Sequence, residues 1–308
     1  MQRIRIRDRQ RLALPEILEA RVNLAATFAI LPHDVSFAGR GGLAETRSAI
    51  VVDFDQDGDL DILASSRRTK QIVWVENLDG RGSFSDEQVL AETLEPVTRI
   101  QTIDLDADGD LDIVYQSFFG TSLTWLQQQS GRLLESRTLI SSDSAISDFQ
   151  LGDLDGDHDI DIVTAESDAD RIAWFAQQNG PEDFSDRKNI STSADSVRSL
   201  ALADIDGDGD LDVLSASALD DSVQWFENAD GQGQFAEAKL INVPQRANSR
   251  VSFVTTADLD GDGDADVMTT SYLLGRVVWY ENLGNREFHS GRMLMDGISR
   301  LNFDVAAI

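Results

Sequence analysis

The residues that could do chemistry in this chain of 308 residues are aspartates, and they recur in five groups of five. Each group has Asp at positions 1, 3, 5, 7 and 9 of a nine-residue segment. The groups are Asp53, Asp55, Asp57, Asp59 and Asp61; Asp104, Asp106, Asp108, Asp110 and Asp112; Asp153, Asp155, Asp157, Asp159 and Asp161; Asp204, Asp206, Asp208, Asp210 and Asp212; and Asp258, Asp260, Asp262, Asp264 and Asp266. Carboxylates this close repel one another unless a cation neutralises them. Oxygen ligands at alternate positions of a tight loop suit a hard cation, so we predict up to five Ca²⁺ sites, one in each Asp loop.

We expect side-chain ligands from positions 1, 3, 5 and 9 and the backbone carbonyl of position 7. An EF-hand is excluded because no loop has Glu at position 12. The alternative is a solvated acidic turn without metal, which repetition of the spacing in five copies disfavours. Position 6 is Gly in four loops and His158 in the third. If that position needs a positive φ, a side chain there adds strain of about 1–3 kcal/mol, so we predict that the third site is the weakest.

The elements that position these loops form a repeat of about fifty residues. The first aspartates of successive loops are 51, 49, 51 and 54 residues apart, and each of the five Trp lies 21 residues after the first Asp of its loop. Four short β-like runs fit within one unit, for example Leu200–Ala203, Leu211–Ser215, Val223–Phe226 and Ala238–Ile241. We therefore predict an all-β fold, a β-propeller of four-stranded blades with five recognisable repeats plus a partial sixth. The repeated Trp is expected in the core between blades rather than in a sugar-stacking platform.

The Asp loop, followed by Leu-Asp-(Ile/Val) and then by Trp-(Phe/Tyr)-Glu-Asn, resembles the FG-GAP/VCBS repeats of integrin-α-like β-propellers. The resemblance covers about residues 48–295 and is closer to the bacterial VCBS-type branch, since Phe-Gly and Gly-Ala-Pro landmarks are not evident. It implies that each Asp loop joins the first and second strands of a blade and holds Ca²⁺. It does not imply one function, because such propellers serve as adhesion modules, lectins and occasionally polysaccharide-cleaving enzymes.

Composition narrows the possible partners. The chain has 55 Asp plus Glu against 26 Lys plus Arg, a formal charge of −29, and no Cys. We expect no nucleic-acid partner, because that function needs a basic face, and no transmembrane segment, because no apolar run approaches about 20 residues. The predicted partner is an extracellular glycan or protein.

The candidate ligand contacts lie opposite the Asp loops, where connections between second and third strands differ from blade to blade. The aromatic candidates are Phe118, Phe119 and Tyr272. The basic candidates are Arg99, Arg198 and Arg250, which with Arg47 and Arg300 recur near the first strand of most units. These arginines either receive an anionic ligand or pair with neighbouring carboxylates, and the acidic composition favours pairing.

We predict that the protein is not an enzyme. The three histidines, His33, His158 and His289, occupy unrelated positions, and no Ser/His/Asp arrangement is present. The favoured function is a calcium-binding adhesion or ligand-binding module. The alternative is a polysaccharide-degrading lyase or hydrolase built on the same propeller.

The ends of the chain differ from the repeats. Residues 1–47 hold 8 Arg against 5 acidic residues and are predicted to be a basic N-terminal segment. This segment is read either as a signal peptide ending near residue 38 or as a closing strand. Residues 48–297 are predicted to form the five blades, and residues 298–308 the first strand of a sixth. Secretion or surface location is expected, because weak Ca²⁺ sites fill at extracellular calcium levels.

Overall fold

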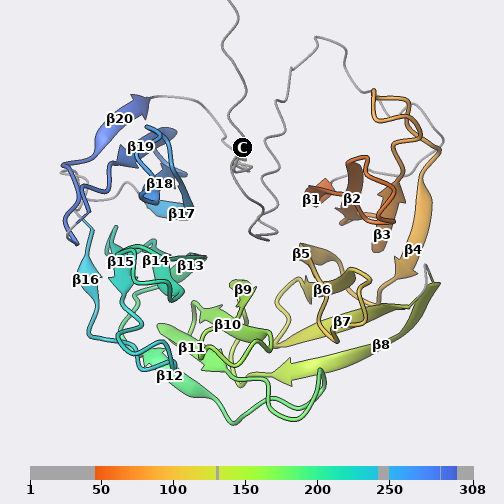
Figure 1. Cartoon of the computed structure of the whole chain (residues 1–308), viewed down its shortest axis with the longest axis horizontal. Helices are drawn as coiled ribbons and strands as arrows, with labels where there is room; N and C mark the ends of the chain where they lie inside the picture. Colours follow the sequence, from red (N-terminus) through yellow and green to blue (C-terminus); the bar gives the residue numbers. More distant parts are fainter. Residues whose placement is uncertain (1–45, 130–131, 242–249, 285, 297–308) are drawn as a thin grey trace, which may run out of the picture. The chain divides into compact units, whose positions relative to one another are not determined.

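The computed structural model describes residues 46–129, 132–241, 250–284 and 286–296. These residues form twenty strands and no helix, in five antiparallel four-stranded sheets (Figure 1). All of them belong to one compact unit. The all-β fold and the five propeller blades are confirmed. Most of the predicted N-terminal segment and the predicted sixth-blade strand lie outside the described residues.

In each blade the four strands follow one another in chain order from the inner strand outward. The strands are, in blade 1, β1 (Thr46–Val52), β2 (Asp61–Ser66), β3 (Gln71–Val75) and β4 (Gln88–Glu92); in blade 2, β5 (Val97–Ile103), β6 (Asp112–Ser117), β7 (Ser122–Gln129) and β8 (Arg132–Ser141); in blade 3, β9 (Asp148–Gly152), β10 (Asp161–Glu166), β11 (Arg171–Phe175) and β12 (Lys188–Ser191); in blade 4, β13 (Val197–Ala203), β14 (Asp212–Ser217), β15 (Val223–Phe226) and β16 (Lys239–Leu240); in blade 5, β17 (Val251–Ala257), β18 (Asp266–Ser271), β19 (Arg276–Tyr280) and β20 (Arg292–Met295).

The four runs expected in the fourth unit all form strands, with small differences in their ends. The inner strand β13 starts at Val197, three residues before the predicted start, because its pairing with β14 continues across an irregularity between Val197 and Ser199. The outer strand β16 is only two residues long. Outer strands pair with a neighbour on one side only. Fewer hydrogen bonds therefore determine where they begin and end.

The hydrophobic core lies between neighbouring blades. Each of four buried clusters takes residues from two successive blades, and inner strands of successive blades contact one another. The expected core role of the tryptophans is confirmed for Trp125, Trp174 and Trp225, which are at most 2% exposed. Trp174 and Trp225 are met edge-on by Phe235 and Phe288 of the following blade. The repeated aromatic position therefore holds one blade to the next.

Candidate metal centres and the opposite loop face

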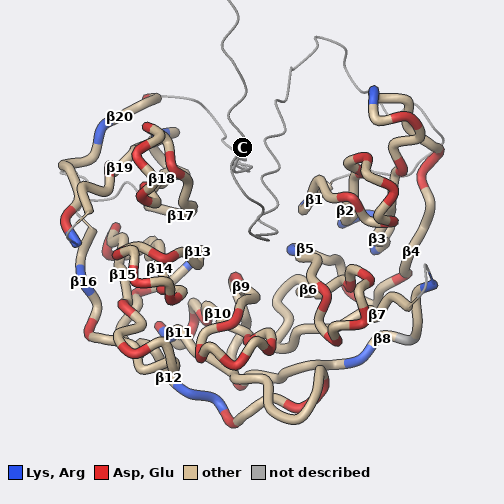
Figure 2. Tube along the Cα trace, viewed as in Figure 1, with Lys and Arg blue, Asp and Glu red and all other residues tan. Residues whose placement is uncertain are grey.

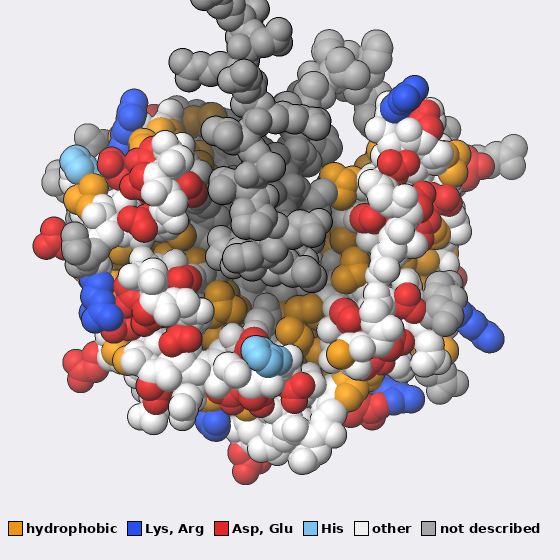
Figure 3. Space-filling view, viewed as in Figure 1, with side chains coloured by type: hydrophobic (Ala, Val, Ile, Leu, Met, Phe, Trp, Pro, Cys, Tyr) orange, Lys and Arg blue, Asp and Glu red, His pale blue; other side chains and the backbone are white. Residues whose placement is uncertain are grey.

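Each Asp loop joins the first and second strands of its blade, so the five loops lie at the same end of the sheets. Figure 2 shows acidic residues in all five blades at these loops, while basic residues lie on outer strands such as β8, β12 and β16. In the space-filling view the acidic side chains recur around the visible face (Figure 3). This end of the molecule is therefore strongly negative.

The aspartate at position 9 anchors the loop. It is buried in every blade, and one of its oxygens accepts the backbone N–H of position 2 at 3.0–3.3 Å. The other oxygen accepts the backbone N–H of the residue sixteen positions later, at 2.7–2.9 Å. Burial raises the pKa of Asp112 and Asp212 to about 6 and that of Asp161 to about 7. Position 9 thus ties each loop to the end of the third strand.

The asparagine after Trp-x-Glu links neighbouring blades. In blade 4 the Asn228 side-chain amide donates to the Leu154 carbonyl in the Asp loop of blade 3, at 2.8 Å. In blade 5 Asn282 donates in the same way to Ile205 of blade 4, also at 2.8 Å. In blades 4 and 5 this asparagine therefore ties the blade to the Asp loop of the preceding one.

The loops are closed by their own carboxylates. The Asp at position 1 accepts the backbone N–H of position 6 at 3.0–3.1 Å, and the Asp at position 5 accepts that of position 7 at 2.9–3.1 Å. Position 6 has a positive φ in all five loops, and His158 adopts φ 73°. The expected conformation of position 6 is confirmed.

Position 4 also has a positive φ, which the sequence did not reveal. It is glycine in loops 3, 4 and 5, but Gln56 and Ala107 adopt φ 61° and 57° there. Glycine favours this left-handed region and residues with a Cβ do not. Strain is therefore present in loops 1, 2 and 3, rather than in loop 3 alone.

The loops bring three carboxylates together. In loops 1, 2, 4 and 5 the aspartates at positions 1, 3 and 5 each place one carboxylate oxygen within 4.8 Å of the other two. In loop 3 the three aspartates are those at positions 1, 3 and 9, Asp153, Asp155 and Asp161. The position-7 aspartates lie outside these clusters, and in loops 1 and 4 they sit against a turn glycine, Gly80 or Gly231. Each cluster could hold a metal ion, and its all-oxygen donor set fits a hard cation.

The electrostatics of position 3 support this fit. Burial, followed by the charge of the carboxylate at position 5, raises the pKa of Asp55, Asp155 and Asp206. Buried oxygens of Asp53 and Asp155 have no hydrogen-bond donor. A buried acceptor without a donor is costly, and a cation at the cluster would satisfy it.

Loop 4 has a basic neighbour that the sequence did not reveal. Arg286, in the turn between β19 and β20 of the next blade, lies 2.9 Å from Asp206 and 2.9 Å from Glu227. The guanidinium therefore neutralises part of the fourth cluster, and it comes from a residue 80 positions further along the chain (286 − 206).

At the opposite end, the predicted aromatic contacts are spread over different blades. Phe119 in blade 2 and Tyr272 in blade 5 are 78% and 61% exposed. Phe118 is half-buried, and Arg67 of blade 1 lies 5.3 Å from its ring centre. Phe119 and Tyr272 are thus available to a partner, while Phe118 also takes part in a contact between blades 1 and 2.

The predicted basic contacts are not equivalent to one another. Arg99 lies within β5 and pairs with buried Asp148 of blade 3 at 2.8 Å, whereas Arg198 and Arg250 are exposed. Pairing with a carboxylate, the favoured interpretation, is confirmed for Arg99. Arg300 lies outside the described residues.

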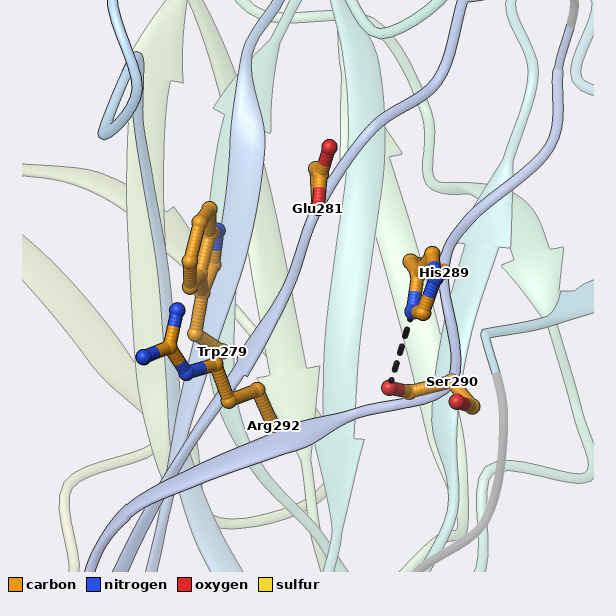
Figure 4. Close-up of a pocket in the computed structure, with 5 residues that line it drawn as sticks. All are labelled: Trp279, Glu281, His289, Ser290 and Arg292. Carbon is orange, nitrogen blue, oxygen red and sulfur yellow. Dashed lines mark hydrogen bonds between the residues drawn. The ribbon is translucent and has the colours of Figure 1, made fainter.

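A pocket of about 410 Å³ lies beside the outer strands of blade 5, lined by Trp279, Glu281, His289, Ser290 and Arg292 (Figure 4). The Arg292 guanidinium lies 5.8 Å from the Trp279 ring centre. Trp279 is half-buried, whereas its counterparts Trp174 and Trp225 are covered by a phenylalanine of the following blade. The pocket therefore lies at the tryptophan that corresponds to Trp174 and Trp225, in the last described blade.

Comparison with known proteins identifies the repeat. The model of the FG-GAP-like repeat matches residues 53–115, 104–164, 153–215 and 204–269, which together span most of the chain. No match was found among curated protein sequences. The described residues contain no helix with the length and hydrophobicity of a membrane span.

Solved structures with a similar fold include a lectin from Agrocybe aegerita, described as recognising non-reducing terminal N-acetylglucosamine. It is 21% identical with a TM-score of 0.60, and the match covers 83% of this chain and 67% of the lectin. The Vibrio cholerae biofilm matrix protein Bap1 is 20% identical with a TM-score of 0.46, and the match covers 78% of this chain and 38% of Bap1. The PQQ-bound aldose sugar dehydrogenase of Streptomyces coelicolor is 12% identical with a TM-score of 0.48, covering 83% of each chain. At these identities the similarity concerns the fold alone.

Proposed function

Because the chain belongs to the family of FG-GAP-like repeat proteins, we propose that it is a calcium-stabilised, ligand-binding β-propeller that works outside the cell. The ligand is a glycan or a protein. Calcium is assigned a structural role: positions 1, 3 and 5 of each Asp loop supply carboxylate oxygens, and position 9 holds the loop in place. No catalytic role is assigned to any residue.

The observation that carries the ligand-binding role is the distribution of exposed apolar side chains. Among the described residues, the four most exposed large apolar side chains are Leu94, Phe119, Leu219 and Tyr272, at 92%, 78%, 63% and 61%. All four lie in connections at the end opposite the Asp loops. Exposed apolar and aromatic side chains on variable loops are typical of binding surfaces. The lectin with a similar fold supports a ligand of this kind for such a scaffold.

The test is a binding screen of the purified chain on glycan and matrix-protein arrays, with calcium and with chelator. We expect binding in calcium, and a loss of binding in either the Phe119→Ala or the Tyr272→Ala variant, according to which of the two blades holds the ligand. Leu78→Ala is the matched control, because Leu78 is 58% exposed at the end that carries the Asp loops. Absence of binding to either array would contradict the proposal.

A second measurement separates binding from catalysis. Incubation of the protein with neutral and acidic polysaccharides is expected to release no reducing ends and no unsaturated products. Product formation would favour the polysaccharide-degrading alternative.

A further inference from the structure

Blade 3 departs from the other four blades at one buried position. The last residue of the second strand in blades 1 to 5 is Ser66, Ser117, Glu166, Ser217 and Ser271. Glu166 is 0% exposed. Four serines show that the blade does not need a carboxylate here, and a buried carboxylate loses its hydration. Glu166 therefore points to a role beyond folding.

Glu166 fixes the guanidinium of Arg171. The Arg171 Nε donates to the Glu166 carboxylate at 2.7 Å, and Nη2 donates both to Glu166 and to Asp143. Arg187 contacts the same Asp143 carboxylate at 2.7 Å. Hydrogen bonds from Arg171 and then Arg187 lower the pKa of Asp143 to about 2. The result is a hydrogen-bonded set of donors and acceptors where blade 3 meets the connection from blade 2.

This set lies at a cavity of about 440 Å³ between blades 2 and 3, at the end opposite the Asp loops. Besides Arg171 and Asp143, the cavity is lined by Thr121, Ser144, Ala145, Asp168 and Ala169. The cavity is open to solvent, so a ligand there would keep one face in water. Hydroxyl, carboxylate and guanidinium groups therefore line this cavity together with two alanines.

The charges select the class of ligand. Arg171 already contacts two carboxylates, so it does not offer a free positive charge to an anion. Asp143 already contacts two arginines, so it does not attract a cation strongly. A neutral molecule with adjacent hydroxyl groups suits this set, because each hydroxyl can donate to a carboxylate and accept from a donor. The exposed Phe119 ring stands two residues before Thr121 and offers an apolar face nearby.

We propose that this cavity between blades 2 and 3 binds one neutral sugar residue, with Asp143 and Asp168 as acceptors and Glu166 as the residue that positions Arg171. The inference rests on the ligand-binding function proposed above and assigns it a ligand class, a neutral saccharide.

The experiment is a calorimetric titration of the full chain, in calcium, with methyl glycosides of mannose, galactose, glucose and N-acetylglucosamine, and with methyl glucuronide as the charged comparison. We expect binding of at least one neutral glycoside and none of the glucuronide. Asp168→Asn removes an exposed charged acceptor, so it is expected to weaken binding about tenfold.

The decisive variant replaces Glu166→Ser together with Arg171→Gln. It reproduces the pair Ser66 and Gln71 of blade 1, so the fold is expected to persist while glycoside binding is lost. Arg276→Gln is the matched control. Arg276 has the same position in blade 5 and the same burial, with 13% of its side chain exposed against 12% for Arg171, and its ion-pair partner is Asp296. Binding by this control is expected to stay unchanged.

The outcomes separate this inference from the proposed function. If the array screen finds a ligand but the double variant binds it as the wild type does, the cavity is not the site and the proposed function survives. Binding of only proteins or acidic glycans also overturns the inference. If the wild type binds nothing on either array, the proposed function itself fails. If the double variant does not fold, Asp168→Asn decides, and unchanged affinity in that variant overturns the site.

Discussion

Two left-handed residues shape each Asp loop, and only loops 4 and 5 have glycine at both places. Without a cation, repulsion among the carboxylates opposes the closed loop, and we infer that the loop then opens and relieves the strain. The strain of a residue with a Cβ therefore opposes mainly the cation-bound form. Since loops 1, 2 and 3 each carry one such residue, the third site is not set apart by strain alone.

We predict that His158→Gly tightens calcium binding at the third loop and that Gln56→Gly does the same at the first. Relief of about 1 kcal/mol corresponds to about fivefold in affinity. Calorimetric calcium titration measures the change. The control is Gly207→Ala, which places a Cβ at φ +76° with no atom within 4 Å and is expected to weaken the fourth site. Unchanged affinities in all three variants would refute control of the site by these residues.

Arg286 gives a second prediction at the scale of one residue. Its guanidinium lies beside Asp206 in the fourth cluster, so it competes with a cation there. We expect Arg286→Gln to tighten calcium binding at one site by several-fold to about tenfold, since half of the Arg286 side chain is exposed and water screens its charge. Arg81→Gln, in the corresponding turn of blade 1, serves as the control with no expected change. Weaker binding in Arg286→Gln would show that the arginine supports the site instead.

At the scale of the elements, a glycine in the turn between the third and fourth strands of blade 4 allows close packing against the preceding blade. A Cβ at Gly233 would lie 2.1 Å from the Trp174 ring of the preceding blade, whereas a Cβ at the corresponding Gly82 has no atom within 4 Å. Both glycines have positive φ. Only Gly233 therefore carries a packing requirement in addition to a backbone one.

We predict that Gly82→Ala lowers the free energy of unfolding by about 1 kcal/mol, through backbone strain alone. Gly233→Ala is expected to lower it by about 2–4 kcal/mol, because the tryptophan must also move. Urea unfolding of the two variants measures the difference. Equal losses would mean that the junction between blades 3 and 4 absorbs a methyl group without strain.

For the whole molecule, we expect the five acidic clusters to link stability to calcium. A cation that binds only the folded state stabilises it by about 2.7 kcal/mol per site at a free concentration one hundred times Kd. Several such sites are comparable with a total stability of about 5–15 kcal/mol. We expect the melting temperature to rise in calcium and to fall in chelator. Magnesium at the same concentration controls for ionic strength, and a melting temperature unaffected by calcium would refute the structural role.

Much of the architecture was predictable because it is repeated. Five Asp loops and five tryptophans at a constant offset of 21 residues give the blade length, and runs between turn signals give four strands per blade. Position 6 was predictable as left-handed, because glycine recurs there in four tight loops and tolerates a positive φ without strain. The positive φ of position 4 was not predictable in the same way, because two of the five loops have Gln56 or Ala107 there instead of glycine.

The sequence by itself determined the repeat, the all-β blades, the acidic loops and the aromatic position between blades, because each depends on local spacing that five copies make visible. Tertiary structure decided which carboxylates anchor the loops and which ones form the clusters. It buried position 9 as an anchor and drew Asp161 into the third cluster. It also placed Arg286 on the fourth cluster and brought Arg171 together with Asp143 and Thr121 at an open cavity between blades 2 and 3. The physical reason is that these contacts join different strands or different blades. The packing of the strands and blades determines which side chains meet, and the order of residues within one loop does not.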